Sequence, residues 1–154
     1  MYSQAHEAPA RVALEMRLTG DSNIILAPQR GNTFGTTSIE VLTTLATPAD
    51  EWAAFMQLVA DKWTSYGARG EDGRPLVPRP HWAKQWSGLV VRGKPVNQYL
   101  KEDAYGEAFA DFRSVFERIV TQRGCTVEET RARFGNALMD GLIFSQHQSY
   151  AAHG

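Results

Sequence analysis

The hydrophobic pattern of this chain changes period at Thr47-Pro48, and that change limits the folds the chain can adopt. Before this point, residues 12–18 alternate between two kinds of side chain, which predicts a strand. Residues 36–45 are rich in β-branched side chains and predict a second strand. We therefore expect a sheet from the first part of the chain and helices from the rest.

Beyond Thr47-Pro48 the apolar residues recur at helical spacing. Thr47 can cap a helix, and Pro48 suits its first position. The apolar stripe that follows is predicted to face the core rather than to form a cofactor site. Its members are Trp52, Phe55, Met56, Val59, Trp63 and Tyr66.

Three further helices complete the expected fold. A long one spans residues 104–122, with these side chains inward: Phe109, Phe112, Phe116, Ile119 and Val120. Thr126 and Glu129 fit a capping box that starts a short helix, and residues 136–144 form the last one. The order of elements predicts an α+β fold, an antiparallel β-sheet with helices packed on one face.

Length and composition suit one domain in a reducing compartment. We expect residues 1–11 to be a flexible segment, 12–146 one α+β domain and 147–154 a tail. The net charge of -1 gives no general attraction to nucleic acid or membrane, and no apolar run could span a bilayer. A single cysteine, Cys125, excludes an internal disulfide and favours a cytoplasmic location. The histidines lack metal-ligand spacing, so no metal site is predicted.

The segment Arg79–Trp86 gathers two cations, an imidazole and two indoles within eight residues. Such groups are costly to bury unless they are paired or functional, and indoles form flat walls with one N–H donor each. This composition suits a pocket for a flat, partly polar ligand. Lys84 could bind a ligand oxygen, or its stem could simply cover Trp82. His81 could be an acid or base, or could hold a structural hydrogen bond.

Glu15 and Arg17 lie two apart in the first predicted strand, so both side chains leave the same face. They could contact a ligand hydroxyl or carbonyl, or form an ordinary exposed ion pair. Glu40 would join them if its strand pairs with the first. A second carboxylate nearby would then raise a carboxyl pKa and suit a proton acceptor.

Taken in order, these motifs resemble the C-terminal, substrate-side part of flavin-dependent oxidases of the vanillyl-alcohol oxidase superfamily. That group includes aldonolactone oxidases, alditol oxidase and the flavin-linked type of cholesterol oxidase. The resemblance rests on Glu15-Met16-Arg17, a loop with Pro28-x-x-Gly31, a second strand and the Arg-Pro-His-Trp-x-Lys run that ends at Lys84. It covers residues 13–144.

The resemblance implies roles for particular residues. Glu15 and Arg17 match the substrate-contacting pair beside the flavin, and Lys84 matches the active-site lysine, so these three are the expected catalytic residues. The expected substrate-binding residues are Glu40, His81, Trp82, Trp86 and Asn136. In such enzymes FAD accepts a hydride from an alcohol carbon, and oxygen reoxidises it.

Two departures from the family pattern shape the expectation. Glu40 and Leu42 stand where sugar-alcohol members carry histidine and threonine, which favours a larger, less hydroxylated alcohol such as a sterol over a sugar polyol. The expected substrate class is an alcohol of sterol, aldonolactone or polyol type. The N-terminal domain that holds FAD does not fit within 154 residues. We therefore expect the substrate-binding half of an FAD-dependent oxidase, active only with an FAD-binding domain or subunit as partner.

Two other classes remain open. The chain could be a non-catalytic module that binds an apolar or steroid-like molecule against Trp82 and Trp86. It could also be an interaction domain whose charged face docks another protein. Flavin colour with oxygen consumption would support the oxidase, and ligand-dependent tryptophan fluorescence without flavin would support the binding module. Neither response would leave the interaction domain.

Overall fold

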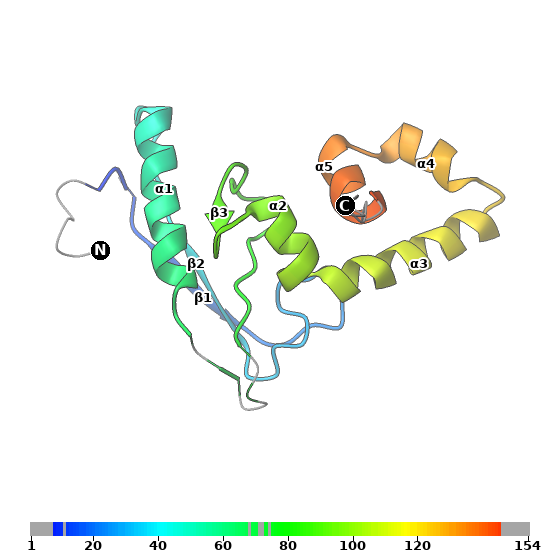
Figure 1. Cartoon of the computed structure of the whole chain (residues 1–154), viewed down its shortest axis with the longest axis horizontal. Helices are drawn as coiled ribbons and strands as arrows, with labels where there is room; N and C mark the ends of the chain where they lie inside the picture. The colour runs from blue at the N-terminus through cyan, green and yellow to red at the C-terminus, as the bar shows by residue number, and fades with distance from the viewer. Residues whose placement is uncertain (1–7, 11, 68, 71–72, 74, 146–154) are drawn as a thin grey trace, which may run out of the picture.

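The structure is a computed structural model that describes residues 8–10, 12–67, 69–70, 73 and 75–145. Its elements are β1 (Glu15–Thr19), β2 (Thr36–Glu40), α1 (Ala49–Thr64), β3 (Val90–Val91), β4 (Lys94–Pro95), α2 (Val96–Tyr99), the π-helix η2 (Leu100–Ala104), α3 (Gly106–Gln122), α4 (Val127–Phe134), α5 (Ala137–Met139) and the π-helix η3 (Asp140–Phe144). The predicted α+β class is confirmed, with two antiparallel two-stranded sheets. Figure 1 shows α1 and the first sheet at one end, α3 to α5 at the other and α2 between them.

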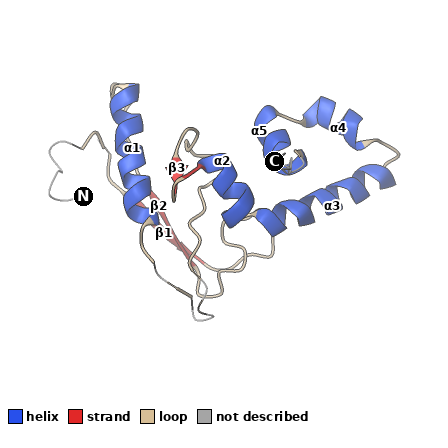
Figure 2. Ribbon diagram, viewed as in Figure 1, coloured by secondary structure: helices blue, strands red, loops and turns tan. Residues whose placement is uncertain are grey.

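The first sheet is a narrow antiparallel ribbon of β1 and β2, drawn as two adjoining red strands in Figure 2. Its register places Glu15 opposite Glu40 and Arg17 opposite Ser38. Residues directly opposite share a face, so one face is polar and charged, as the alternation predicted. The other face carries Met16, Leu18 and Ile39, and all three side chains are exposed.

The core lies around α2 and the start of α3 rather than on the first sheet. Its buried residues are Trp86, Val91, Val96, Tyr99, Leu100, Ala104, Tyr105, Phe109, Leu142 and Ile143. Tyr99 and Leu100 have no exposed surface, and the Tyr99 hydroxyl donates to the Pro78 carbonyl over 2.9 Å. This core connects the end of the segment Arg79–Trp86 to the helices that follow it.

Helix α1 begins later than predicted and is only half-buried. Pro48 is its N-cap residue, while the Thr47 hydroxyl bonds the Thr43 hydroxyl instead of capping the helix. Of the predicted stripe only Val59 is buried, and Tyr66 is exposed, so the stripe is not the main core. The Gln57 amide holds α1 on β3, because it both donates to and accepts from the Val90 backbone over 2.8 Å.

The C-terminal helices agree closely with their sequence signals. The capping box of Thr126 and Glu129 is present at the start of α4. The Asn136 side chain caps α5, so a helix begins where it was expected. One expectation for α3 is wrong, because Ile119 is 52% exposed instead of facing inward.

The predicted end segments lie largely outside the described residues, which leave out 1–7, 11 and 146–154. Within the described part, Pro9 is buried, and its carbonyl accepts a hydrogen bond from the Thr43 hydroxyl over 2.6 Å. Among the described helices, none combines the length and the apolar character needed to cross a bilayer.

Candidate functional site

The first part of the candidate site is a pair of opposite charges on β1. The two-residue period of the strand brings Glu15 and Arg17 to the same face, where the guanidinium and carboxylate lie 2.6 Å apart. Their side chains are 48% and 69% exposed, respectively. An ion pair this exposed is screened by solvent and adds little to stability, so the fold does not depend on it.

The second part joins the sheet to the segment Arg79–Trp86. Glu40 lies opposite Glu15, and its carboxylate forms an ion pair with the Lys84 ammonium. Only 20% of the Glu40 side chain is exposed, against 52% for Lys84. Three separate segments therefore bring two carboxylates and two cations together on the polar side of the ribbon.

Charges on this face determine the protonation of its groups. The Lys84 ammonium, which donates a hydrogen bond to the Glu40 carboxylate, lowers the pKa of that carboxyl, and Arg17 and His81 lower it further. A neighbouring carboxylate was expected to raise a carboxyl pKa on this face. For Glu40 the shift goes the other way, because the hydrogen bond from Lys84 and the charges of Lys84, Arg17 and His81 outweigh the effect of desolvation. Glu15 in turn raises the pKa of Arg17.

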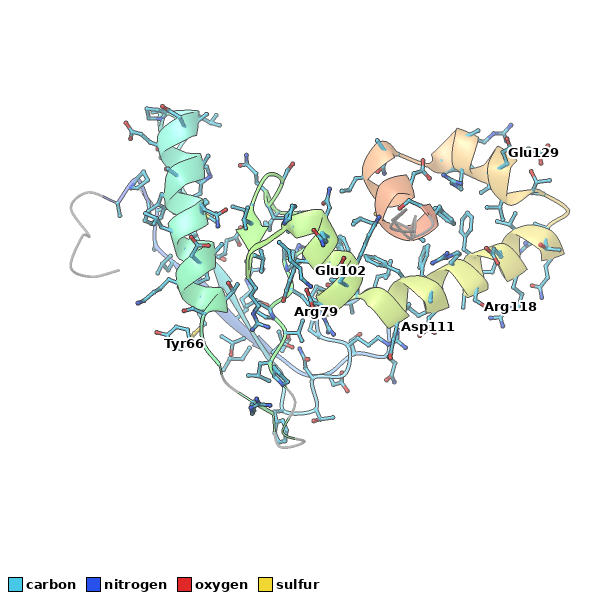
Figure 3. The ribbon with its side chains drawn as sticks, viewed as in Figure 1. Tyr66, Arg79, Glu102, Asp111, Arg118 and Glu129 are labelled. Atoms are coloured by element: carbon cyan, nitrogen blue, oxygen red, sulfur yellow. The ribbon has the colours of Figure 1, made fainter. Side chains whose placement is uncertain are left out.

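Arg79 fixes the position of the segment that carries Lys84. Its guanidinium donates to the backbone carbonyls of Pro28, Arg30 and Ala104 over 3.1, 2.8 and 3.0 Å. It also lies 5.1 Å from the centre of the Tyr105 ring. Figure 3 shows Arg79 close to α2. Because these contacts occupy the guanidinium with backbone carbonyls, Arg79 supports the site rather than taking part in it.

Trp82 lines a hollow of about 290 Å³ between the segment and α5. Its indole N–H donates to the Leu26 carbonyl over 2.7 Å, and its ring packs 5.0 Å from that of Tyr105. The hollow is lined by Leu26, Trp82, Asn136, Leu138 and Met139. Sequence reasoning selected Trp82 and Asn136 but missed the aliphatic members. No periodic pattern marks Leu26 as a neighbour of α5.

Three predicted substrate-binding residues form hydrogen bonds with neighbouring backbone groups of the chain. Trp86 is 6% exposed in the core, its indole N–H donates to the His81 carbonyl, and it does not line the hollow at Trp82. His81 is exposed, and its Nδ1 accepts from the Ala83 amide over 3.2 Å. Asn136 lines the hollow, but its side-chain oxygen caps α5 by accepting from the Met139 amide.

The charged side chains on this face suit the ring of a flavin cofactor rather than its phosphate groups. Two cations beside two carboxylates can contact an alcohol hydroxyl and can stabilise negative charge on an adjacent ring. Phosphate groups need a different cradle, and the sequence contains no glycine-rich GxGxxG loop to form one. The described residues also contain no cluster of three His, Cys, Asp or Glu side chains that could hold a metal ion.

No family profile, curated protein or solved structure matches this chain.

Proposed function

We propose that this chain is the substrate-binding half of an FAD-dependent alcohol oxidase and that a separate domain or subunit holds the FAD. One observation supports the proposal most strongly. Glu15, Glu40 and Lys84 come from three separate segments and meet, together with Arg17, on one open face of a ribbon. Charged side chains gathered on an otherwise thin, exposed sheet suit contact with a ligand and a partner surface.

Each charged residue of this face has a separate role in the proposed reaction. When bound beside the face, FAD supplies the hydride acceptor, and oxygen restores it. Arg17 holds the Glu15 carboxylate in place, and that carboxylate accepts the proton of the substrate hydroxyl. Lys84, held by Glu40, supplies positive charge where the ring becomes electron-rich.

Charge balance and the hollow indicate the class of alcohol. Arg17 and Lys84 are each matched by a carboxylate, so a carboxylated substrate would have to displace one of these ion pairs. A neutral alcohol meets no such cost. The hollow at Trp82, which stands two residues before Lys84 in the sequence, has an apolar lining that includes Leu26 and Met139. A bulky, weakly hydroxylated alcohol such as a sterol fits these features better than a polyol.

The test is to produce the chain alone and together with an FAD-binding domain taken from an oxidase of the same superfamily. The chain alone should purify without flavin absorbance and should consume no oxygen. The complex should be yellow and should consume oxygen with a sterol. Flavin retained by the chain alone, or failure of every such domain to form an oxygen-consuming complex, would contradict the proposal.

A second candidate function is supported by the hollow itself. Its aliphatic lining around Trp82 could bind a small apolar molecule without any redox chemistry. In that case a sterol would change the tryptophan fluorescence of the chain alone, while no FAD-binding domain would yield oxygen consumption. A fluorescence response together with oxygen consumption by the complex supports the oxidase.

A further inference from the structure

The outer edge of β1 is unpaired. The first sheet contains β1 and β2 only, and in the described part of the chain no third strand joins it. A sheet of two strands has little stability in water, and unpaired N–H and C=O groups along an edge can pair with another strand. The edge of β1 is therefore free to accept a further strand.

The apolar row of β1 is also uncovered. Met16 and Leu18 are 67% and 75% exposed, and they share the face opposite Glu15 and Arg17. Leu14, which directly precedes the strand, is 44% exposed. A row of large apolar side chains in this position would gain from neighbours on an adjacent strand. A partner for this edge should therefore present apolar residues at the same two-residue spacing.

The sequence of β1 is complementary to itself in one antiparallel register. When a two-fold axis relates two antiparallel copies of a strand, residues that lie opposite each other belong to the same face of the sheet. The axis must therefore pass at one residue, which then lies opposite its own copy, and not between two consecutive residues. An axis at Glu15 sets the two Glu15 carboxylates opposite each other, and an axis at Arg17 does the same to the guanidiniums. An axis at Met16 instead places Glu15 opposite Arg17 of the second copy.

The same axis at Met16 also matches the apolar row. The two Met16 side chains then face each other, and extension of the strand by one residue sets Leu14 opposite Leu18 of the second copy. Charge and apolar pattern thus agree on one register, whereas the edge of β2 offers no comparable match. In β2 the only charged residue is Glu40, which Lys84 already neutralises.

We propose that two copies of this chain associate edge to edge through β1, antiparallel about Met16, to form a continuous four-stranded sheet. The strand order is then β2, β1, β1 of the second copy and β2 of the second copy. Main-chain hydrogen bonds along the edge supply affinity, and the Glu15–Arg17 alternation sets the register. Because this interface is a strand edge, the proposal holds whether or not the polar face meets a flavin.

Sedimentation equilibrium of the full chain measures this association. The wild-type chain should show a mass of twice 17.1 kDa. Glu15→Arg alone, or Arg17→Glu alone, sets like charges opposite each other twice per dimer, so each should raise the dissociation constant about tenfold or more. An equimolar mixture of the two variants restores opposite charges at both positions and should dimerise like the wild type.

The controls separate this interface from general charge effects. Glu117→Arg and Arg118→Glu change an exposed pair on α3, shown at the far end of the helix by the Arg118 label in Figure 3, and should leave the wild-type mass unchanged. Far-UV circular dichroism checks that each variant is folded. A monomeric wild-type chain, a dimer indifferent to the single substitutions, or a mixture that fails to restore it would each overturn the proposal.

Discussion

The ammonium of Lys84 forms an ion pair with the carboxylate of Glu40, and this contact ties the segment Arg79–Trp86 to the β1–β2 ribbon. Glu40 lies opposite Glu15, which is itself paired with Arg17. The four charges are thus arranged as two neutral pairs on one face. Each cation of this face is therefore neutralised by a carboxylate next to it.

The Lys84–Glu40 pair predicts a measurable pKa. Lys84 lowers the pKa of Glu40 below its ordinary value of 4.5. A carboxyl with a lowered folded-state pKa stabilises the fold above about 4.5, and this stability is lost as pH falls through the lowered value. Lys84→Met should therefore raise the pKa of Glu40, measured by carbon NMR of its carboxyl group. Lys62→Met, on α1, should leave it unchanged, and an unaffected pKa in Lys84→Met would contradict the pairing.

Arg79 should contribute to folding rather than to chemistry. Its guanidinium satisfies three backbone carbonyls that belong to two different segments, the loop at residues 28–30 and the end of η2 at Ala104. Arg79→Met leaves these acceptors unsatisfied and should lower the free energy of unfolding by about 3 kcal/mol in urea titration. Arg118→Met, an exposed change on α3, should cost under about 0.5 kcal/mol. If the two substitutions lower the free energy of unfolding equally, the three hydrogen bonds of Arg79 do not stabilise the fold as proposed.

Local signals predicted several elements of the fold correctly. The capping box at Thr126 and the N-cap at Asn136 each depend on neighbouring residues alone. The strands predicted over residues 12–18 and 36–45 are present but shorter, at Glu15–Thr19 and Thr36–Glu40. The end of the long helix at Gln122 was also predicted correctly. Such features are visible in one sequence because their causes lie within a few residues.

Tertiary contacts account for what the sequence did not reveal. Trp86 and Trp82 lie in the same short segment, yet one packs into the core and the other lines the hollow. The pKa of Glu40 depends on Lys84, which lies far away in the sequence. The apolar stripe of α1 is only half-buried because the core forms around Tyr99 and includes no residue of α1. Periodicity shows which face is apolar, but not what covers it.

Trp82 should report ligand binding by the chain alone. A sterol titrated into the protein should change the tryptophan fluorescence, because the Trp82 ring lines the hollow. Trp82→Phe should abolish most of this change. Trp52→Phe, which alters a half-buried indole on α1, should preserve it. If both variants respond equally to the sterol, the hollow at Trp82 is not the binding site.

The central claim is that the face bearing Lys84, Glu15 and Arg17 acts on an alcohol beside a flavin. Anaerobic mixing of a sterol with the complex of this chain and an FAD-binding domain measures this step through the loss of yellow flavin absorbance. We predict that the wild-type complex bleaches and that Lys84→Met slows bleaching about 100-fold, while Lys62→Met does not. Bleaching at the same rate in Lys84→Met, or none with the wild-type chain, would contradict the account.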